Sequence, residues 1–539
     1  MSCDNRELIK LKIIMINTLN YKSLIGAFLS GIMLTCSFPE TGFDKMAWIA
    51  LLPLFISTLN LSTKESFFAG LITGIVHYFT LLYWLLPFLQ KFAYLHVIPA
   101  VSVLLLLSAY LAFYIAIFSL ISNRVPSSPF SFLIIMPALW VSCEYLRTFL
   151  FSGFPWELLG YSQYARIYLI QISDITGTYG ISFLVVLANA VFFQIFLFIS
   201  KNEWHGRRVN ALQLISSVIL VGLFFSIITF YGNKRLKYID IQAYNSEKIN
   251  IAIVQGNIDQ TKKWDPEFQY ATTKKIIDLS LSAKDKRPDL VVWPETAATF
   301  YFLYNQAMTG MVMNGIIKSG ADFLIGSPSF KTNNEQVKYY NSAFLVSKKG
   351  ELLDKYDKVH LIPFGEYVPL KKLLWFIENI VEGSGDFSQG KTIDTLKWGD
   401  YKLGIQICGE IIFPNLSRTM TNKKAGLLIN ITNDAWYGKT GAPYQHFSMA
   451  VLRAVENRRS LIRSANTGIS AFVDPAGRVF DRTPLYKEAV VTRSMPVLKT
   501  ETFYTKYGDL FALTCLCVAI AFIFSGYIMG RTSNRKYYY

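Results

Sequence analysis

The chain has 539 residues, of which 52% are apolar, 15% aromatic and only 17% charged. This composition excludes a disordered or fibrous protein and argues against an ordinary soluble enzyme. The net charge of +16 would suit a nucleic-acid-binding protein, but it would equally suit the cytoplasmic loops of a membrane protein. Charged residues are sparse in 1–246 and dense in 247–507, so the sequence predicts a membrane part followed by a water-exposed part.

Charge-free runs predict eight transmembrane spans, because a bilayer is crossed by about 20 apolar residues of helix. Seven spans lie in an N-terminal membrane domain, residues 1–246, and the eighth lies in residues 508–539 with a cytoplasmic tail. The first run is the shortest and could instead be a signal peptide, although no cleavage-site pattern follows it. The runs are 23–39, 46–63, 66–90, 97–122, 125–143 (the span continuing to about 149), 175–200, 210–233 and 510–530.

Basic residues in short loops predict the orientation, because Lys and Arg are retained on the cytoplasmic side of a membrane. With a cytoplasmic N-terminus, the basic loops share that side, and the opposite loops carry few basic residues. Residues 247–507 then lie outside the cytoplasm, and nucleic acid is not needed to explain the charge. The basic residues concerned are Arg6, Lys10, Lys12, Lys22, Lys64, Arg124, Lys201, Arg207, Arg208, Arg531, Arg535 and Lys536.

From about residue 249, short β-branched runs alternate with longer amphipathic segments, which is typical of an α/β domain with helices covering a sheet. Residues 247–507 are enough for one large domain with its own core. The expected helices are 266–283, 302–318 and 444–457. The expected strands are 249–255, 289–293, 322–327, 342–347, 403–407, 426–432, 461–465 and 470–474.

Of the six cysteines, only Cys408 lies in this α/β domain, so neither an internal disulfide nor a CxxC zinc site can form there. Cys408 follows the predicted strand 403–407 and precedes an irregular helix predicted over 411–422. A sulfur at a helix N-terminus is favoured as the thiolate. The pattern therefore indicates a nucleophile that still needs a base or a cation, with a buried structural cysteine as the alternative.

Two charged residues follow other predicted strand ends. Glu295 comes just past the apolar run 289–293, where Pro294 stops the strand ladder. Lys358 precedes a loop rich in Pro and Gly, 363–369. Each could instead be an exposed surface charge, which is the usual fate of Glu and Lys.

The segments around Glu295, Lys358 and Cys408 together resemble the nitrilase, or carbon–nitrogen hydrolase, superfamily, whose Glu–Lys–Cys triad lies on an α-β-β-α sandwich. Over nearly the whole chain, the spans and further segments resemble its membrane-bound branch, the apolipoprotein N-acyltransferase family. This combination is more specific than any single motif. The further segments are Gly153-Phe154-Pro155-Trp156, Val254-Gln255-Gly256-Asn257, Lys263-Trp264, Pro363-Phe364-Gly365-Glu366-Tyr367-Val368-Pro369, Asn433-Asp434-Ala435-Trp436-Tyr437-Gly438 and Gln445-His446.

The resemblance implies a two-step acyl transfer in a bacterial inner membrane, with residues 247–507 on the periplasmic side. Cys408 would take a fatty acyl group from a phospholipid as a thioester. It would then pass the group to the α-amino group of a diacylglyceryl-modified Cys at the N-terminus of an apolipoprotein. The implied partners are these two substrates and membrane lipids. We expect a monomer without a cofactor, without a metal and without nucleic acid.

The resemblance also implies residue roles around the nucleophile. Glu295 would be the general base, and Lys358 would stabilise the oxyanion of each tetrahedral intermediate. Glu366 and Glu410 would be supporting carboxylates, although Glu410 could merely complement a helix N-terminus.

Three further positions concern the substrate. Trp264 and Trp436 are implied to contact it, although each could be a plain interfacial anchor. An aromatic residue often follows the family's nucleophile, whereas Gly409 follows it here. A role for a side chain at this position is therefore in doubt.

Two other functions compete with acyl transfer. A membrane-tethered amidase or nitrilase would use water as the acceptor. A non-catalytic receptor or transporter would need no nucleophile, but transport predicts polar or broken helices deep in the spans. Apart from Glu144 and Arg147, the spans contain almost no ionisable residues. These two lie at i and i+3, and we expect them to pair with each other.

Overall fold

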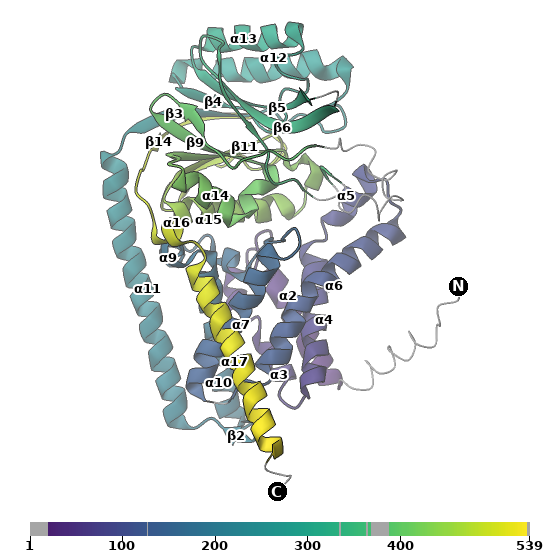
Figure 1. Ribbon diagram of the computed structural model, residues 1–539, viewed down its shortest axis with the longest axis vertical. Coiled ribbons are helices and arrows are strands. Elements are labelled where there is room, and N and C mark those ends of the chain that lie inside the picture. Colours follow the sequence, from purple (N-terminus) through teal and green to yellow (C-terminus); the bar gives the residue numbers. More distant parts are fainter. Residues whose placement is uncertain (1–19, 127, 334–335, 363–364, 368–386, 536–539) are drawn as a thin grey trace.

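A helical part and a layered α/β part lie at opposite ends of the computed structural model (Figure 1). The structure describes residues 20–126, 128–333, 336–362, 365–367 and 387–535. The chain before Ser246 and the last helix form the helical part. Outside the described residues lie Arg6, Lys10, Lys12, Pro363, Phe364, Val368, Pro369 and Lys536.

Four helices of the described chain are long and apolar enough to cross a membrane, or five if α4 and α5, bent by 56° at their junction, form one broken span. The four are α6, α10, α11 and most of α7. The helices of this part are α2 (Tyr21–Cys36), η1 (Asp44–Trp48), α3 (Leu52–Ser57), α4 (Thr63–Leu81), α5 (Leu85–Phe92), α6 (Val97–Ser122), α7 (Pro129–Phe149), η2 (Leu159–Gln163), α8 (Ile167–Ile170), α9 (Ser173–Thr176), α10 (Thr178–Ser200), α11 (Ala211–Asn245) and α17 (Leu510–Arg535).

Eight spans are therefore not confirmed. The expected span 46–63 is not one helix, because η1 ends at Trp48 and Pro53 lies in the first turn of the six-residue α3. Proline is tolerated at a helix start but ends a helix that would run through it. The expected span 23–39 contains only a short apolar helix, Tyr21–Cys36. The expected span 510–530 lies within one continuous helix, α17 (Leu510–Arg535).

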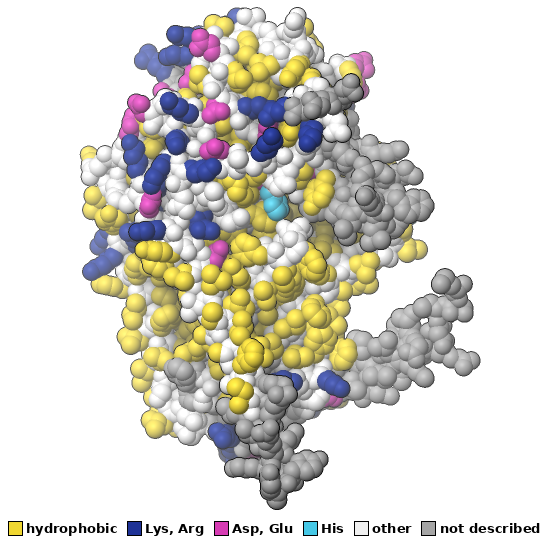
Figure 2. Space-filling view, in the orientation of Figure 1, with side chains coloured by type: hydrophobic (Ala, Val, Ile, Leu, Met, Phe, Trp, Pro, Cys, Tyr) yellow, Lys and Arg dark blue, Asp and Glu magenta, His cyan; other side chains and the backbone are white. Residues whose placement is uncertain are grey.

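Exposed hydrophobic side chains form a belt around the visible face of the helical part, while charged side chains gather over the α/β part (Figure 2). Large examples on the helices are Ile98, Leu106 and Leu212, which are 79%, 71% and 75% exposed. Such a continuous apolar surface is unfavourable in water and is typical of contact with lipid. The described residues thus fit a membrane protein with a water-exposed domain.

The α/β part is an α-β-β-α sandwich of two six-stranded sheets. Helices α12 (Pro266–Ser282) and α13 (Gln306–Ser319) cover one outer face, and α14 (Pro414–Asn422) and α15 (Ala442–Asn457) cover the other (Figure 1). The sheet orders are β14-β3-β4-β5-β6-β7 and β13-β12-β11-β10-β9-β8. The strands are β3 (Lys248–Gln255), β4 (Leu290–Val292), β5 (Asp322–Asn333), β6 (Gln336–Val346), β7 (Leu352–Asp357), β8 (Leu396–Trp398), β9 (Tyr401–Ile407), β10 (Leu427–Thr432), β11 (Ser460–Ala465), β12 (Ala471–Val473), β13 (Val479–Phe480) and β14 (Ala489–Pro496).

The sequence predicted the buried strands and missed strands at the sheet edges. All eight expected strands and all three expected helices are present, with ends displaced by up to six residues. The missed strands are β7, β8, β13 and β14, and each lies at or next to a sheet edge. Edge strands are partly exposed, so their sequences lack the continuous apolar run of a buried strand.

Helix α15 joins the sandwich to the helical part, and every residue along it except the half-buried Tyr444 is buried. Gln445 Oε1 accepts hydrogen bonds from the indole N–H groups of Trp84 (3.2 Å) and Trp156 (2.8 Å). Just after the helix, Arg458 pairs with Asp174 of α9 at 2.8 Å. Because both partners are almost fully buried, the two parts are joined by interior polar contacts.

Glu144 and Arg147 on α7 hold the loop that follows this helix. Glu144 Oε1 accepts from the backbone N–H of Leu159 at 2.7 Å, and Arg147 Nη1 donates to the carbonyl of Trp156 at 3.2 Å. The expected ion pair between them is not among the contacts of the described residues. The indole of Trp156 stacks on His446 of α15, with ring centroids 5.9 Å apart.

We predict that Asp174→Ala lowers the stability of the protein by about 3 kcal/mol, because it leaves the buried Arg458 guanidinium without its carboxylate. The midpoint of thermal unfolding of the purified protein in detergent measures this loss. Asp240→Ala is the matched control, since Asp240 pairs with Arg478 at 2.6 Å in a largely exposed site. That change should cost about 0.5 kcal/mol, and an equal shift in both variants would contradict the prediction.

Candidate active site

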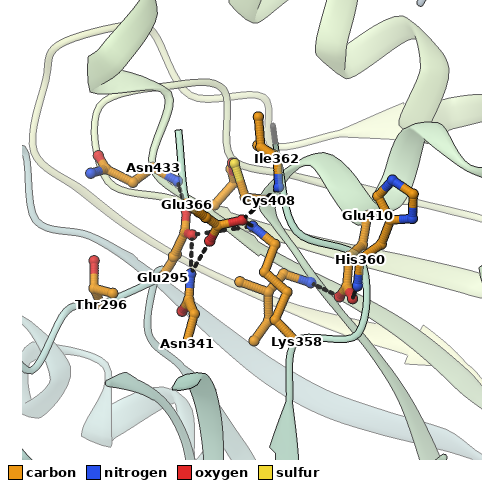
Figure 3. Close-up of polar contacts among 12 residues, drawn as sticks. Glu295, Thr296, Asn341, Lys358, His360, Ile362, Glu366, Cys408, Glu410 and Asn433 are labelled. Carbon is orange, nitrogen blue, oxygen red and sulfur yellow. Dashed lines mark hydrogen bonds and ion pairs between the residues drawn. The ribbon is translucent and has the colours of Figure 1, made fainter. Parts of the chain in front are cut away.

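Three strand ends bring Glu295, Lys358 and Cys408 together (Figure 3). Glu295 follows β4, Lys358 directly follows β7, and Cys408 directly follows β9. Strands β4 and β7 belong to one sheet and β9 to the other. The site therefore forms where the two sheets face each other, and all three side chains are buried.

One buried ammonium and two carboxylates form the charged centre of the site. Lys358 Nζ lies 2.8 Å from Glu366 Oε2 and 3.9 Å from Glu295 Oε1. The amide of Asn341 donates to both carboxylates, to Glu295 at 2.7 Å and to Glu366 at 3.0 Å. The backbone N–H of Asn433 donates to the second oxygen of Glu295 at 2.9 Å (Figure 3). Both oxygens of Glu295 thus have a donor.

The backbone turns sharply at Cys408. Its φ of 52° lies in the left-handed region, which a residue with a Cβ rarely adopts and which often marks a functional site. The 3₁₀ helix η5 (Cys408–Ile412) begins at this residue. Behind it, Asn430 donates to the Cys408 carbonyl at 3.3 Å, and its own side-chain oxygen accepts from Arg463. These buried contacts hold the strained turn in place.

The electrostatic surroundings keep the resting thiol protonated. Burial raises the pKa of Cys408, and the nearby Glu295 carboxylate raises it further, against the opposite effect of Lys358. The sequence-based expectation that a helix N-terminus favours the thiolate is therefore wrong for the resting site. The 3₁₀ helix that begins at Cys408 has only five residues, so its dipole is small compared with the cost of burying a charge.

Burial and neighbouring charges also shift the pKa values of Glu295 and Lys358. Burial raises the pKa of Glu295, with Lys358 acting against burial. For Lys358, burial lowers the pKa, but Glu366 and Glu295 more than compensate and raise it above the ordinary value. Lys358 is therefore permanently cationic, and Glu295 is a carboxylate with an increased affinity for a proton.

Glu410 links the Lys358 segment to the Cys408 segment. Its oxygens accept from the backbone N–H groups of Val359 (2.7 Å) and His360 (3.0 Å), just after Lys358. They also accept from the N–H of Ile407 at 2.8 Å, just before Cys408. Burial raises the pKa of Glu410 to about 7. Glu410 does more than complement a helix N-terminus, because it contacts both segments.

The two tryptophans lie in different surroundings. Trp264 is 43% exposed on the loop between β3 and α12. Trp436 is half-buried and packs edge-on against Phe92 of α5, with ring centroids 4.7 Å apart. Gly409 is closely packed, since a Cβ built there would lie 3.1 Å from the Ile362 side chain.

Sequence reasoning missed three groups of this site: Asn341, the backbone N–H of Asn433, and Lys263. Lys263 is buried, and its Nζ lies 3.1 Å from the carbonyl of Glu295. The signal for Asn341 was a polar residue directly before the apolar run 342–347. No local pattern distinguishes Lys263 from its exposed neighbour Lys262.

A metal centre is not indicated by the described residues, among which no group of three or more His, Cys, Asp or Glu side chains could hold a metal ion. His446 instead takes part in a buried polar cluster. Its Nδ1 lies 3.1 Å from Asp434 Oδ1, and Arg463 pairs with the other oxygen of Asp434 at 2.9 Å.

Comparison with known proteins identifies both parts of the chain. Residues 250–502 match the family described as carbon-nitrogen hydrolase, which gives the class of the α/β domain. Residues 30–191 match the apolipoprotein N-acyltransferase N-terminal domain. The chain belongs to the apolipoprotein N-acyltransferase family.

Relatives of similar length are named apolipoprotein N-acyltransferase. The apolipoprotein N-acyltransferase of Geobacter metallireducens is 43% identical over 92% of this chain and 94% of its own. That of Methylococcus capsulatus is 30% identical over 93% of this chain and 95% of its own. Among solved structures, an amidase from Nesterenkonia sp. is 21% identical, with a TM-score of 0.35, over 46% of this chain and 90% of its own.

We predict that alkylation of Cys408 by iodoacetamide is slow at neutral pH and rises about tenfold per pH unit up to at least pH 9. The reason is that the thiolate reacts, and burial raises the pKa of this thiol. The rate is measured by mass spectrometry in a variant in which all other cysteines are Ala. A rate that levels off below pH 8 would contradict the prediction.

Proposed function

We propose that this chain transfers a fatty acyl group from a membrane phospholipid, through a thioester on Cys408, to the α-amino group of the diacylglyceryl-Cys of an apolipoprotein. Its family membership makes it an acyltransferase of lipoprotein maturation. The proposed residue roles rest on one observation: the Cys408 thiol, the Lys358 ammonium and the Glu295 carboxylate lie close together at three strand ends.

In the first step the Cys408 sulfur attacks the ester carbonyl carbon while Glu295 takes the thiol proton. Lys358 stabilises the negative charge that develops on the carbonyl oxygen. When the intermediate collapses, the C–O bond breaks and Glu295 returns the proton to the departing glycerol oxygen. A lysophospholipid leaves, and the acyl group stays on sulfur as a thioester.

In the second step the α-amino nitrogen of the acceptor attacks the thioester carbonyl. Glu295 takes a proton from this nitrogen, and Lys358 again stabilises the oxyanion. Collapse breaks the C–S bond, and the proton passes from Glu295 to the sulfur. The product is an amide, and the thiol and the carboxylate are regenerated.

The raised pKa values of the thiol and of Glu295 are compatible with this scheme. A base of increased proton affinity is better matched to a thiol of raised pKa, which makes proton transfer during the attack more favourable. Because Lys358 remains charged, the site keeps one fixed cation for the oxyanion. Glu366 would hold the Lys358 ammonium, from which it lies 2.8 Å away, and Glu410 would hold the adjacent backbone.

Two features support lipid substrates. Extraction of an acyl chain into water costs about 0.8 kcal/mol per methylene, so a site close to the bilayer avoids a large loss. Trp436 packs against α5, a helix of the apolar helical part. It would contact an acyl chain. Trp264 would contact substrate from the exposed loop. Exclusion of water from the site would also protect the thioester from hydrolysis.

The proposed topology places the sandwich in the periplasm of a bacterium, above its inner membrane. The sandwich lies at one end of the molecule, and the basic hairpin strand β2 (Arg207–Arg208) lies at the other (Figure 1). This separation supports a cytoplasmic location for the basic loops. We propose that the chain acts as a monomer, without a cofactor and without nucleic acid.

We predict that the purified protein, incubated with acyl-labelled phospholipid, gains a label that hydroxylamine removes and that Cys408→Ala lacks. Added peptide with a diacylglyceryl-Cys at a free N-terminus should discharge this label as an amide. Peptide mass spectrometry locates both acyl groups. Persistence of the label in Cys408→Ala would refute the thioester, and release only as free fatty acid would identify water as the acceptor.

We predict that Glu410→Gln slows thioester formation by about 100-fold. The amide would present N–H groups to backbone donors, and a displacement of about 1 Å at a reacting group is enough for such a loss. The rate of label uptake in single-turnover experiments measures it. Glu351→Gln is the control, because Glu351 lies at an exposed position. This variant should react at the wild-type rate.

A further inference from the structure

A second buried ammonium lies beside Glu295 and has no part in the proposed mechanism. Lys263 is 2% exposed, although both neighbours in its loop, Lys262 and Trp264, are exposed. Its Nζ donates to the backbone carbonyl of Glu295 at 3.1 Å and to Thr296 Oγ1 at 2.6 Å. A lysine is almost never fully buried unless it is paired, so this burial calls for an explanation.

The backbone that Lys263 contacts is strained. Thr296 has a φ of 46°, which is an outlier for a β-branched residue and persists only where its surroundings hold it. This residue directly follows Glu295, so its conformation sets the direction in which the chain leaves the carboxylate. The two hydrogen bonds from Lys263 hold the carbonyl before Thr296 and the hydroxyl of Thr296 itself.

The same loop also reaches the Glu295 carboxylate from its other side. Gln260 Oε1 accepts from the side chain of Asn433 at 2.7 Å, and the backbone N–H of Asn433 donates to Glu295 Oε2 at 2.9 Å. Figure 3 shows Asn433 and Thr296 near Glu295, away from Lys358. The loop that carries Trp264 thus supports both the main chain and the side chain of Glu295.

We infer that Lys263 is a positioning residue for the general base, holding the strained backbone after β4 so that the Glu295 carboxylate faces Cys408 and Lys358. This role rests on the proposed function, in which Glu295 takes the proton. It also ties the Trp264 loop to the base, because one buried side chain belongs to the loop and contacts the Glu295 backbone.

The positive charge of Lys263 also supports the role of Glu295 as a base. Glu295 and Cys408 interact electrostatically with its ammonium, and Lys358, just after β7, and Glu366, in the following segment, interact with Glu295. Burial lowers the pKa of Lys263 to about 8, so it is mainly charged at neutral pH. The positive charge lowers the pKa of Glu295 and keeps more of the base deprotonated.

The test compares Lys263→Met with Lys262→Met, in the full-length protein. Lys263→Met should slow thioester formation by about 10- to 100-fold, as expected for a displaced catalytic group. It should also move the acid limb of the rate–pH profile to higher pH, because loss of the cation raises the pKa of Glu295. Lys262→Met, which removes an exposed lysine next to it, should leave both unchanged.

Thr296→Val gives a milder second variant that removes only the hydroxyl that Lys263 contacts. It should slow thioester formation by about tenfold, and combination with Lys263→Met should add no further loss, since the Thr296 hydroxyl acts through its contact with Lys263. Wild-type rates in both Lys263→Met and Thr296→Val, or fully multiplicative losses in the double variant, would overturn the inference.

Hydrogen exchange separates this inference from the proposed function. In Lys263→Met, peptides covering 257–265 and 293–300 should exchange faster than in Lys262→Met. If the wild type forms no thioester, the proposed function fails, while the exchange data still decide whether Lys263 holds the Glu295 backbone. Equal exchange in the two lysine variants would refute that role.

Discussion

The site depends on charges that are kept away from water. Lys358, Glu295 and Glu366 are all buried, and each would be costly to bury alone. They are tolerated because the ammonium pairs with one carboxylate at 2.8 Å and lies near the other at 3.9 Å, while Asn341 donates to both. The removal of any member leaves an unpaired buried group, so the surrounding backbone must be held rigidly.

The rigidity comes from hydrogen bonds to the backbone at each strand end. Glu410 binds the N–H groups beside Lys358 and before Cys408. Lys263 binds the carbonyl of Glu295, and Asn430 binds that of Cys408. Each support comes from a different segment, so three strand ends in two sheets are held in one arrangement. This is also why left-handed backbone conformations persist at Cys408 and Thr296.

The helical part reaches this site through α15. Trp84 and Trp156 both donate to Gln445, and Trp156 stacks on the neighbouring His446, which lies in the polar cluster with Asp434 and Arg463. The helical part is therefore packed directly against α15 and the polar cluster that His446 joins. The apolar helical part and the charged α/β domain are in this way one structure rather than two joined by a linker.

The sequence by itself determined the α/β class, the buried strands, the family and the three residues at the centre of the site, because apolar runs and strand-end motifs are local features. The eight spans it predicted are not confirmed, since absence of charge does not ensure a continuous helix through Pro53. Only the tertiary structure decided the protonated state of Cys408 and the burial of Lys263, because desolvation and charge proximity depend on segments far apart in the chain. It also decided the partners of Glu410, which come from two sheets that no local pattern brings together.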